Sequence, residues 1–309
     1  MHPRVSIGLP VYNGERYLQL AIDSVLAQSF SDFELIISDN ASTDGTESIC
    51  QANASRDHRI RYLRQPSNMG VTRNFNLLVD HATAQFFKWA SADDLIARDL
   101  LERCFAVIAE DPTLVLVHSK TRFIDANGKP LAQEDSGLHL VEDEPFDRLR
   151  KLWDTLGYCN AQYGIMRIDA LRRTRLFGSF LSSDVCFLAE LVLHGKFFEI
   201  PEHLIFRRFH DEAASRLSAA QLLEHYGLQG RLVLYHWRLS YENAMLILRA
   251  PIAVAQKARA LTLVARRMVW LRAALSQELG FLVRHITGRP YPILGSMRRF
   301  SRPSSGSPQ

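Results

Sequence analysis

The stretch Phe86-Phe87-Lys88-Trp89-Ala90-Ser91-Ala92-Asp93-Asp94-Leu95 decides the fold that we expect for this chain. Its aromatic first half has the composition of a buried strand, and small residues then lead to two adjacent carboxylates. In an open α/β sheet the carboxyl ends of the strands face the ligand crevice, so this pair is placed to hold a divalent metal with a phosphorylated substrate. The alternative is that the two Asp residues cap the next helix, where Asp is favoured.

Strand and helix patterns alternate before this stretch. Apolar runs predict three strands, at residues 5–9, 33–38 and 60–63. Apolar positions at three- and four-residue steps predict helices between them, for example from Leu18 to Leu26. Asp44 and Glu47 resemble a capping box for the second helix. Repeats of this kind predict an α/β fold with a mainly parallel, doubly wound sheet.

The pattern after this stretch is less regular. Strands are predicted near 114–118, 121–125, Gly164 and 204–209, and helices at 97–110, 146–156 and 182–193. Residues 121–143, with a turn at Asn127-Gly128, are expected to form an excursion beside the sheet.

Composition excludes several classes of protein. The chain has 309 residues, of which 47% are hydrophobic and 23% charged, as in a globular protein with one large domain and an appendage. Four scattered cysteines suggest neither a zinc site nor a disulfide framework, so we expect reduced thiols and a cytoplasmic location. The N-terminus lacks a signal-peptide pattern, and no apolar run reaches the length of a membrane span.

The C-terminal region is basic, with eleven Lys or Arg and one acidic residue in 249–309. Helices are predicted at 221–248 and 252–286. Two interpretations stay open: residues 250–302 lie on an anionic membrane, or the helices pack on the catalytic domain or on a second copy in a homo-oligomer. A nucleic-acid partner is not expected, because the aromatic residues of a single-strand groove are missing.

Four motifs at successive strand ends carry a resemblance to a known family. They are Pro10-Val11-Tyr12-Asn13, Asp39-Asn40-Ala41-Ser42-Thr43-Asp44-Gly45-Thr46, Asn68-Met69-Gly70 with Arg73-Asn74, and Ser91-Ala92-Asp93-Asp94. In this order and spacing they resemble the family 2 nucleotide-sugar glycosyltransferases, which have the Rossmann-like GT-A fold. The resemblance implies a catalytic domain at 1–215, with a nucleotide-sugar half at about 1–118 and an acceptor half at about 119–215. A basic helical extension at 216–300 and a disordered tail at 301–309 would follow.

The resemblance implies how the donor is bound. Pro10, Tyr12 and Asn13 would line the nucleotide base pocket, and Asp39 would accept a hydrogen bond from the N3-H of a pyrimidine. Arg73 would lie near the base or the diphosphate. The alternatives are a core position for Tyr12, helix capping by Asp39 and a solvated Arg73.

The resemblance also implies a metal site. Asp93 would contact the ribose, and Asp94 would bind Mn²⁺ or Mg²⁺ together with His210, although a lone His is more often structural. The chain departs from a common form of the pattern at Ser91, where an acid often stands. The number of direct metal ligands therefore stays open.

Asp184, which opens a predicted helix, resembles the family's catalytic base, with Asp211 and Glu212 as reserve candidates. The alternative is that Ser183 caps this helix and Asp184 only favours its positive end. We expect an inverting enzyme that moves a hexosyl or deoxyhexosyl group from a UDP or dTDP donor to a glycan or lipid-linked acceptor, at the inner face of the plasma membrane. The other hypotheses are a catalytically weak GT-A module that binds nucleotide sugars or acts as a scaffold, and another nucleotide-sugar-using transferase.

Overall fold

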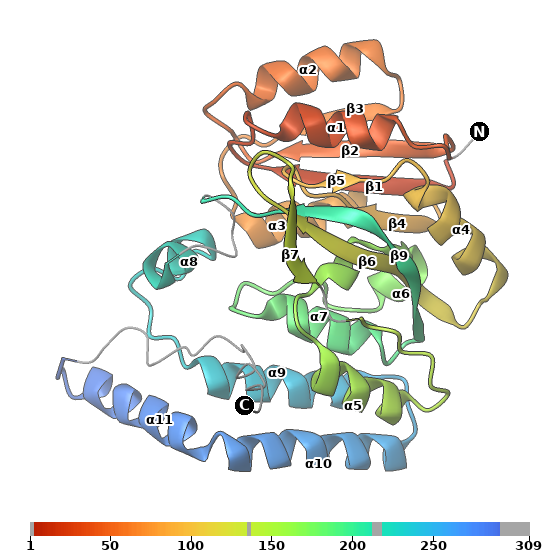
Figure 1. Ribbon diagram of the computed structural model, residues 1–309. Helices are drawn as coiled ribbons and strands as arrows, with labels where there is room; N and C mark the ends of the chain where they lie inside the picture. Colours follow the sequence, from red (N-terminus) through yellow and green to blue (C-terminus); the bar gives the residue numbers. More distant parts are fainter. Residues whose placement is uncertain (1–2, 135–136, 212–217, 291–309) are drawn as a thin grey trace, which may run out of the picture.

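A single curled sheet runs through the protein, with helices on both of its faces (Figure 1). The computed structural model describes residues 3–134, 137–211 and 218–290. Within them the strands are β1 (Val5–Val11), β2 (Phe33–Asp39), β3 (Ile60–Arg64), β4 (Phe86–Trp89), β5 (Leu95–Ile96), β6 (Leu114–Ile124), β7 (Pro130–Glu134), β8 (Ile165–Arg167) and β9 (Lys196–Arg208). The strand order is β3-β2-β1-β4-β8-β6-β9-β5, and β7 pairs with β6.

Most strands of the sheet point the same way. β1 pairs in parallel with β2 and β4, β2 with β3, and β6 with β9. β8 is antiparallel to both β4 and β6, so β6 and β9 share the direction of β1 to β4, whereas β5, β7 and β8 run against it. The prediction of a mainly parallel α/β sheet is confirmed.

The helices connect and cover these strands. In chain order they are α1 (Leu18–Leu26), α2 (Thr46–Arg56), α3 (Val71–His81), α4 (Leu100–Glu110), α5 (Pro145–Thr155), the 3-10 helix η1 (Asn160–Tyr163), α6 (Ile168–Arg172), α7 (Ser183–Leu191), α8 (Ala219–His225), α9 (Tyr235–Arg249), α10 (Val254–Trp270) and α11 (Arg272–Ile286). No helix among the described residues is both long and apolar enough to span a bilayer.

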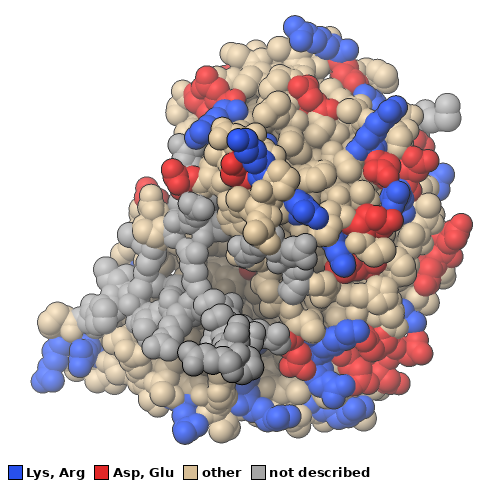
Figure 2. Space-filling model, viewed as in Figure 1, with Lys and Arg blue, Asp and Glu red and all other residues tan. Residues whose placement is uncertain are grey.

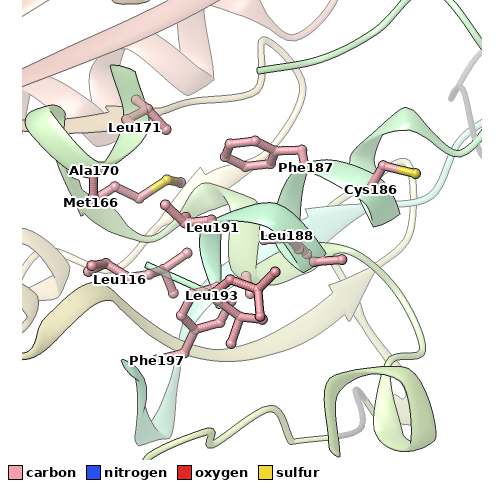
Figure 3. Packing of buried hydrophobic residues seen from close by; sticks show 14 of the residues in the cluster. Leu116, Met166, Ala170, Leu171, Cys186, Phe187, Leu188, Leu191, Leu193 and Phe197 are labelled. Atoms are coloured by element: carbon pink, nitrogen blue, oxygen red, sulfur yellow. The ribbon is translucent and has the colours of Figure 1, made fainter. Parts of the chain in front are cut away.

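Two apolar cores lie on the two faces of the sheet. One joins β1 and β2 to α1 and α4. The other is built around α7, whose Phe187, Leu188 and Leu191 belong to one cluster with Leu116 of β6 and Phe197 of β9 (Figure 3). α7 is buried on nearly every side, and this fixes the helix that carries Asp184 at its first turn.

Several predicted boundaries were wrong for local reasons. The helix expected at 221–248 is interrupted, because Gly227 and Gly230 have φ angles of 64° and 66°, which end α8 before α9 begins. The helix expected at 252–286 breaks at Leu271. Residues 121–124 continue β6 rather than leaving the sheet, although the predicted Asn127-Gly128 hairpin turn is present.

The capping box predicted at Asp44 and Glu47 is absent, because Gly45 is the N-cap residue of α2. The Asp44 carboxylate instead accepts hydrogen bonds from the backbone N–H groups of Glu15 and Thr46. It therefore joins two loops as well as serving its own helix.

The C-terminal helices are docked on the part of the protein that contains the sheet. Leu246 and Ile247 of α9 and Val264 of α10 belong to the core around α7. Arg175 forms an ion pair of 3.0 Å with Glu242 of α9. The domain boundary near residue 215 stays a prediction, and the tail predicted at 301–309 lies outside the described residues, as does 291–300.

Replacing Gly8 by Ala should destabilise the protein. A Cβ at Gly8 would lie 2.7 Å from Phe87 Cζ and 2.9 Å from Leu78 Cβ. Overpacking of this kind costs about 1–3 kcal/mol, which urea denaturation can measure. Gly280→Ala in α11 is the control, because no atom lies within 4 Å of its new Cβ, and it should raise helix stability by about 0.5–1 kcal/mol. Equal stability of Gly8→Ala and the wild type would contradict the packing described for β1.

Candidate functional site

The loops that follow β1 and β2 are tied together by hydrogen bonds. The backbone N–H of Asn13 donates to Ser42 Oγ at 2.9 Å, and Thr43 N–H donates to Asn13 Oδ1 at 2.9 Å. Asn13 has a φ of 50°, a conformation that Asn tolerates better than most residues. Tyr12, beside it, is 49% exposed. The first two sequence motifs therefore form one rim, with an aromatic ring open to solvent.

Asp39 organises this rim from beneath. Its side chain is fully buried, and its carboxylate accepts hydrogen bonds from Ser42 N–H at 2.8 Å, Tyr62 Oη–H at 2.8 Å and Arg64 Nη1 at 2.7 Å. Burial and the hydrogen bond to Asp39 raise the pKa of Tyr62. A carboxylate has about four acceptor positions, so one remains for a further donor. Sequence analysis missed Tyr62 and Arg64, which lie on the neighbouring strand β3.

The start of α3 is fastened to the same edge. The Asn74 side chain donates to the Ser38 carbonyl at 3.0 Å, and Ser38 Oγ donates to Asn74 Oδ1 at 2.6 Å. Arg73, the preceding residue, is exposed, and its guanidinium has no carboxylate partner among the described residues. The structure thus brings Arg73 to the end of β2, where Asp39 also lies.

The Asp93–Asp94 loop follows β4 and is held by the end of β9. Ser91 Oγ donates to Asp93 Oδ1, and His210 Nε2 lies 2.9 Å from Asp93 Oδ2. The Arg208 backbone N–H donates to Asp94 Oδ1 at 2.8 Å, and Arg208 Nε donates to the Asp93 carbonyl at 2.9 Å. Residues more than one hundred positions apart in the chain therefore meet here.

The two carboxylates have opposite protonation tendencies. The protein around the half-buried Asp94 raises its pKa to about 8, first by excluding water and second through the negative charge of Asp93. Burial also opposes ionisation of Asp93, but hydrogen bonds from His210 and Ser91 outweigh it and hold the pKa of Asp93 below its usual value. Two acids this close repel each other when both are ionised.

Arg208 links this loop to the first one. Its guanidinium is buried, lies 4.6 Å from the ring centre of Tyr17, and donates to the carbonyls of Asp125 and Ala126. The Tyr17 ring is also 4.9 Å from the His210 ring. Sequence analysis did not identify Arg208 or Tyr17. The adjacent Arg207 and Arg208 stand in an otherwise apolar predicted strand, and this pattern could have indicated a buried cation with a specific partner.

Asp184 is the second residue of α7 and is partly buried. Its Oδ1 accepts a hydrogen bond from the backbone N–H of Val185 at 2.9 Å, while Ser182 Oγ lies 2.9 Å from Tyr235 Oη. Burial, and then the charge of Asp184, raise the pKa of Tyr226. Among the described residues no hydrogen bond joins Asp184 to the Asp93–Asp94 loop, so its roles as base and as helix-end charge both stay open.

The metal site predicted from the sequence is present only as a partial donor set. No group of three or more His, Cys, Asp or Glu side chains in the described residues is arranged to hold an ion. Asp94 is available, and the buried Nδ1 of His210 has no hydrogen-bond partner in the described part of the chain. Mg²⁺ usually binds through one or two carboxylates plus substrate phosphates, and these residues fit that mode rather than a preformed cage. Asp211 is described, but Glu212 is outside the described residues.

Lys88 lies behind the carboxylates. Its side chain is completely buried, and Nζ donates to the carbonyl of Trp89 at 3.1 Å and to that of Tyr163. With Ser91 and Asp94 it lines a small pocket. Burial lowers the pKa of Lys88 to about 8.

Comparison with protein families gives one match over more than half of the chain. The model of Glycosyl transferase family 2 matches residues 6–175. An uncharacterized glycosyltransferase of Haemophilus influenzae is 33% identical over 129 residues, which are 42% of this chain and 51% of that protein. A chondroitin synthase of Escherichia coli is 32% identical over 126 residues, covering 41% of this chain and 18% of that protein. The chain thus spans about half or less of these curated relatives.

Solved structures share the fold. S. aureus TarS residues 1–349 in complex with UDP superimposes with a TM-score of 0.63 at 18% identity, covering 86% of this chain and 71% of that chain. The mannosyltransferase PcManGT from Pyrobaculum calidifontis, in complex with GDP-Man and Mn²⁺, gives a TM-score of 0.53 at 18% identity, covering 95% and 78%. At this identity the likeness establishes the GT-A fold.

Lys88→Met should change how stability depends on pH. The folded-state pKa of about 8 lies below the ordinary value of 10.5, so burial of the ammonium opposes folding below pH 8. This penalty disappears as pH rises from about 8 to about 10.5, where the wild type should gain about 3 kcal/mol relative to Lys88→Met. Urea denaturation at several pH values measures the difference. The exposed Lys129→Met is the control and should show no such trend; a pH-independent difference for Lys88→Met would refute the buried charge.

Proposed function

Since the chain belongs to glycosyl transferase family 2, we propose that it transfers a sugar, with inversion, from a UDP or dTDP donor to a glycan or lipid-linked acceptor. The observation that carries the proposal is the meeting of the loops after β1, β2, β4 and β9 at one edge of the sheet. Asn13 joins the first two loops through Ser42 and Thr43, and Arg208 joins the last two to the start of α1. Ligand sites in open α/β sheets lie at this edge.

In this proposal the base of the donor rests against Tyr12, with Pro10 and Asn13 beside it. Asp39 uses its remaining acceptor position for the N3-H of the pyrimidine, and Asp93 contacts the ribose. Arg73, which is exposed and has no carboxylate partner within the described part of the chain, faces the diphosphate. Support comes from the fold neighbour TarS, which is recorded with UDP and with UDP-GlcNAc.

Asp94 and His210 would hold a Mn²⁺ or Mg²⁺ ion together with the diphosphate. The neighbour PcManGT, recorded with GDP-Man and Mn²⁺, supports a metal. Such an ion supplies charge stabilisation for the leaving diphosphate. Ser91 donates to the carboxylate of Asp93 and Arg208 donates to its backbone carbonyl, so both residues position this loop.

Asp184 is proposed as the base that takes the proton of the acceptor hydroxyl as it attacks the anomeric carbon. An inverting transfer needs one such carboxylate and no covalent intermediate. Asp211 is the reserve candidate within the described residues. The acceptor and the predicted place at the cytoplasmic side of a membrane stay predictions. The second candidate is a module that binds nucleotide sugars without transferring them. The observation in its favour is Ser91, because a common form of the family pattern has an acid at this position.

Two variants separate transfer from binding. Asp94→Ala should abolish manganese-dependent UDP binding, measured by calorimetry. Asp184→Asn should leave that binding unchanged and lower sugar transfer by about 10²–10⁴-fold, the usual contribution of a general base. Asp80→Asn, at an exposed site on α3, is the control for loss of a carboxylate. If Asp184→Asn keeps wild-type transfer, Asp184 is not the base; if no nucleotide sugar is turned over by the wild type, the binding module is favoured.

Tyr12→Ala should weaken UDP binding about tenfold or more, because stacking of a base on an aromatic ring contributes about 1–3 kcal/mol. The ring is half exposed, so the free energy of unfolding should change by less than about 0.5 kcal/mol. Tyr241→Ala on α9 is the matched control, since Tyr241 is similarly exposed and lies on another helix. Equal UDP affinity in the two variants would remove Tyr12 from the site.

A further inference from the structure

The outermost helices, α10 and α11, expose large apolar side chains. Five of them, at the end of α10 and along α11, are between 45% and 73% exposed: Val269, Trp270, Leu279, Val283 and Ile286. We refer to these five residues, with the exposed cations described below, as the outer face. Large apolar side chains that gather on one surface mark an interaction site more often than single exposed ones do.

The apolar residues of α11 are aligned. Leu279, Val283 and Ile286 are separated by four and three residues, so they lie along one flank of the helix. On the opposite flank Phe281 is buried, and Leu275, one turn before Leu279 at the start of α11, is buried too. α11 contacts α9. Leu279, Val283 and Ile286 form an apolar stripe that faces away from the rest of the protein.

Uncompensated positive charge accompanies the stripe. Arg266, Arg272, Arg284 and Arg289 are exposed, and within the described residues none of them forms an ion pair with a carboxylate. Figure 2 shows Lys and Arg along the lower edge of the molecule, where Figure 1 has α10 and α11.

The acidic residue of this region does not neutralise these cations. Glu278 is turned inward, where it accepts hydrogen bonds from the backbone N–H of His236 at 2.9 Å and lies 2.7 Å from His236 Nδ1. Two other Arg residues of α10 contact the protein itself: the guanidinium of the exposed Arg259 lies 4.2 Å from the ring centre of Phe146, and Arg267 is half-buried. The four exposed Arg residues named above are therefore available to bind an external anion.

We propose that the outer face docks on an anionic lipid bilayer. The apolar stripe and Trp270 enter the boundary between headgroups and acyl chains, where Trp is favoured, and the Arg residues contact lipid phosphates. A second copy of the chain is a poorer occupant, because a two-fold contact through this face would bring cations against cations. The inference does not rest on the proposed function, since it uses only α10 and α11.

The test is co-sedimentation of the full chain with vesicles made of equal parts phosphatidylglycerol and phosphatidylcholine, compared with phosphatidylcholine alone. The wild type should pellet with the anionic vesicles only, and high salt should release it because charges are screened within about 3 Å at 1 M. Arg284→Gln with Ile286→Gln should weaken binding at least fivefold, since one cation near such a surface contributes about that factor. Leu20→Gln with Arg56→Gln, on α1 and α2, is the matched control and should bind like the wild type.

A second measurement locates the contact. Brominated lipid should quench the fluorescence of Trp270, which is 72% exposed, and this quenching should be lost in Trp270→Phe. Equal pelleting of the Arg284/Ile286 variant and its control would overturn the proposal. So would a concentration-dependent oligomer of the wild type that the Arg284→Gln and Ile286→Gln changes dissociate while leaving vesicle binding unaltered. Neither result depends on sugar transfer.

Discussion

The parallel alignment of β1, β2 and β4 is the constraint on which the rest of the structure depends. Val11 is level with Asp39 in the β1–β2 pairing, and β4 lies on the other side of β1. Three loops therefore leave the sheet at one edge, whatever their sequences. β9 returns to this edge from the far side of the sheet and brings His210 to Asp93, which completes the rim.

Buried charge gives this rim its shape. Asp39 accepts hydrogen bonds from three donors, two on β3 and one in the loop after β2, and Arg208 reaches loops that follow β4 and β6. In a low-dielectric interior an unpaired ion is costly, so each of these groups restricts its loop to conformations that supply its partners. The exposed Tyr12 and Arg73 stand on this framework and remain free to meet a ligand. Rigid support beneath exposed side chains is the arrangement that binding of a flexible nucleotide requires.

The mainly parallel α/β sheet and most of its strands and helices could be predicted from the sequence, because apolar periodicity and loop chemistry are local properties. Arg208, Tyr17 and Lys88 were not identified, since their partners lie on other strands and a single sequence does not reveal long-range contacts. Helix ends near Gly230 and Leu271 were missed because continuous apolar spacing concealed the turns. The functional roles of Asp39 and Asp184 are defined by their contacts with a ligand, so contacts within the chain do not determine these roles.

The central claim is that one pocket, framed by Asp39, Arg73, Asp94 and His210, receives a nucleoside diphosphate with a divalent ion. The most direct measurement is a crystal structure with UDP and Mn²⁺, using anomalous scattering to locate manganese. The account predicts one strong manganese peak beside Asp94 and His210, with the diphosphate against it and the uracil near Asp39. Nucleotide bound at another edge of the sheet, or manganese away from Asp94, would contradict it.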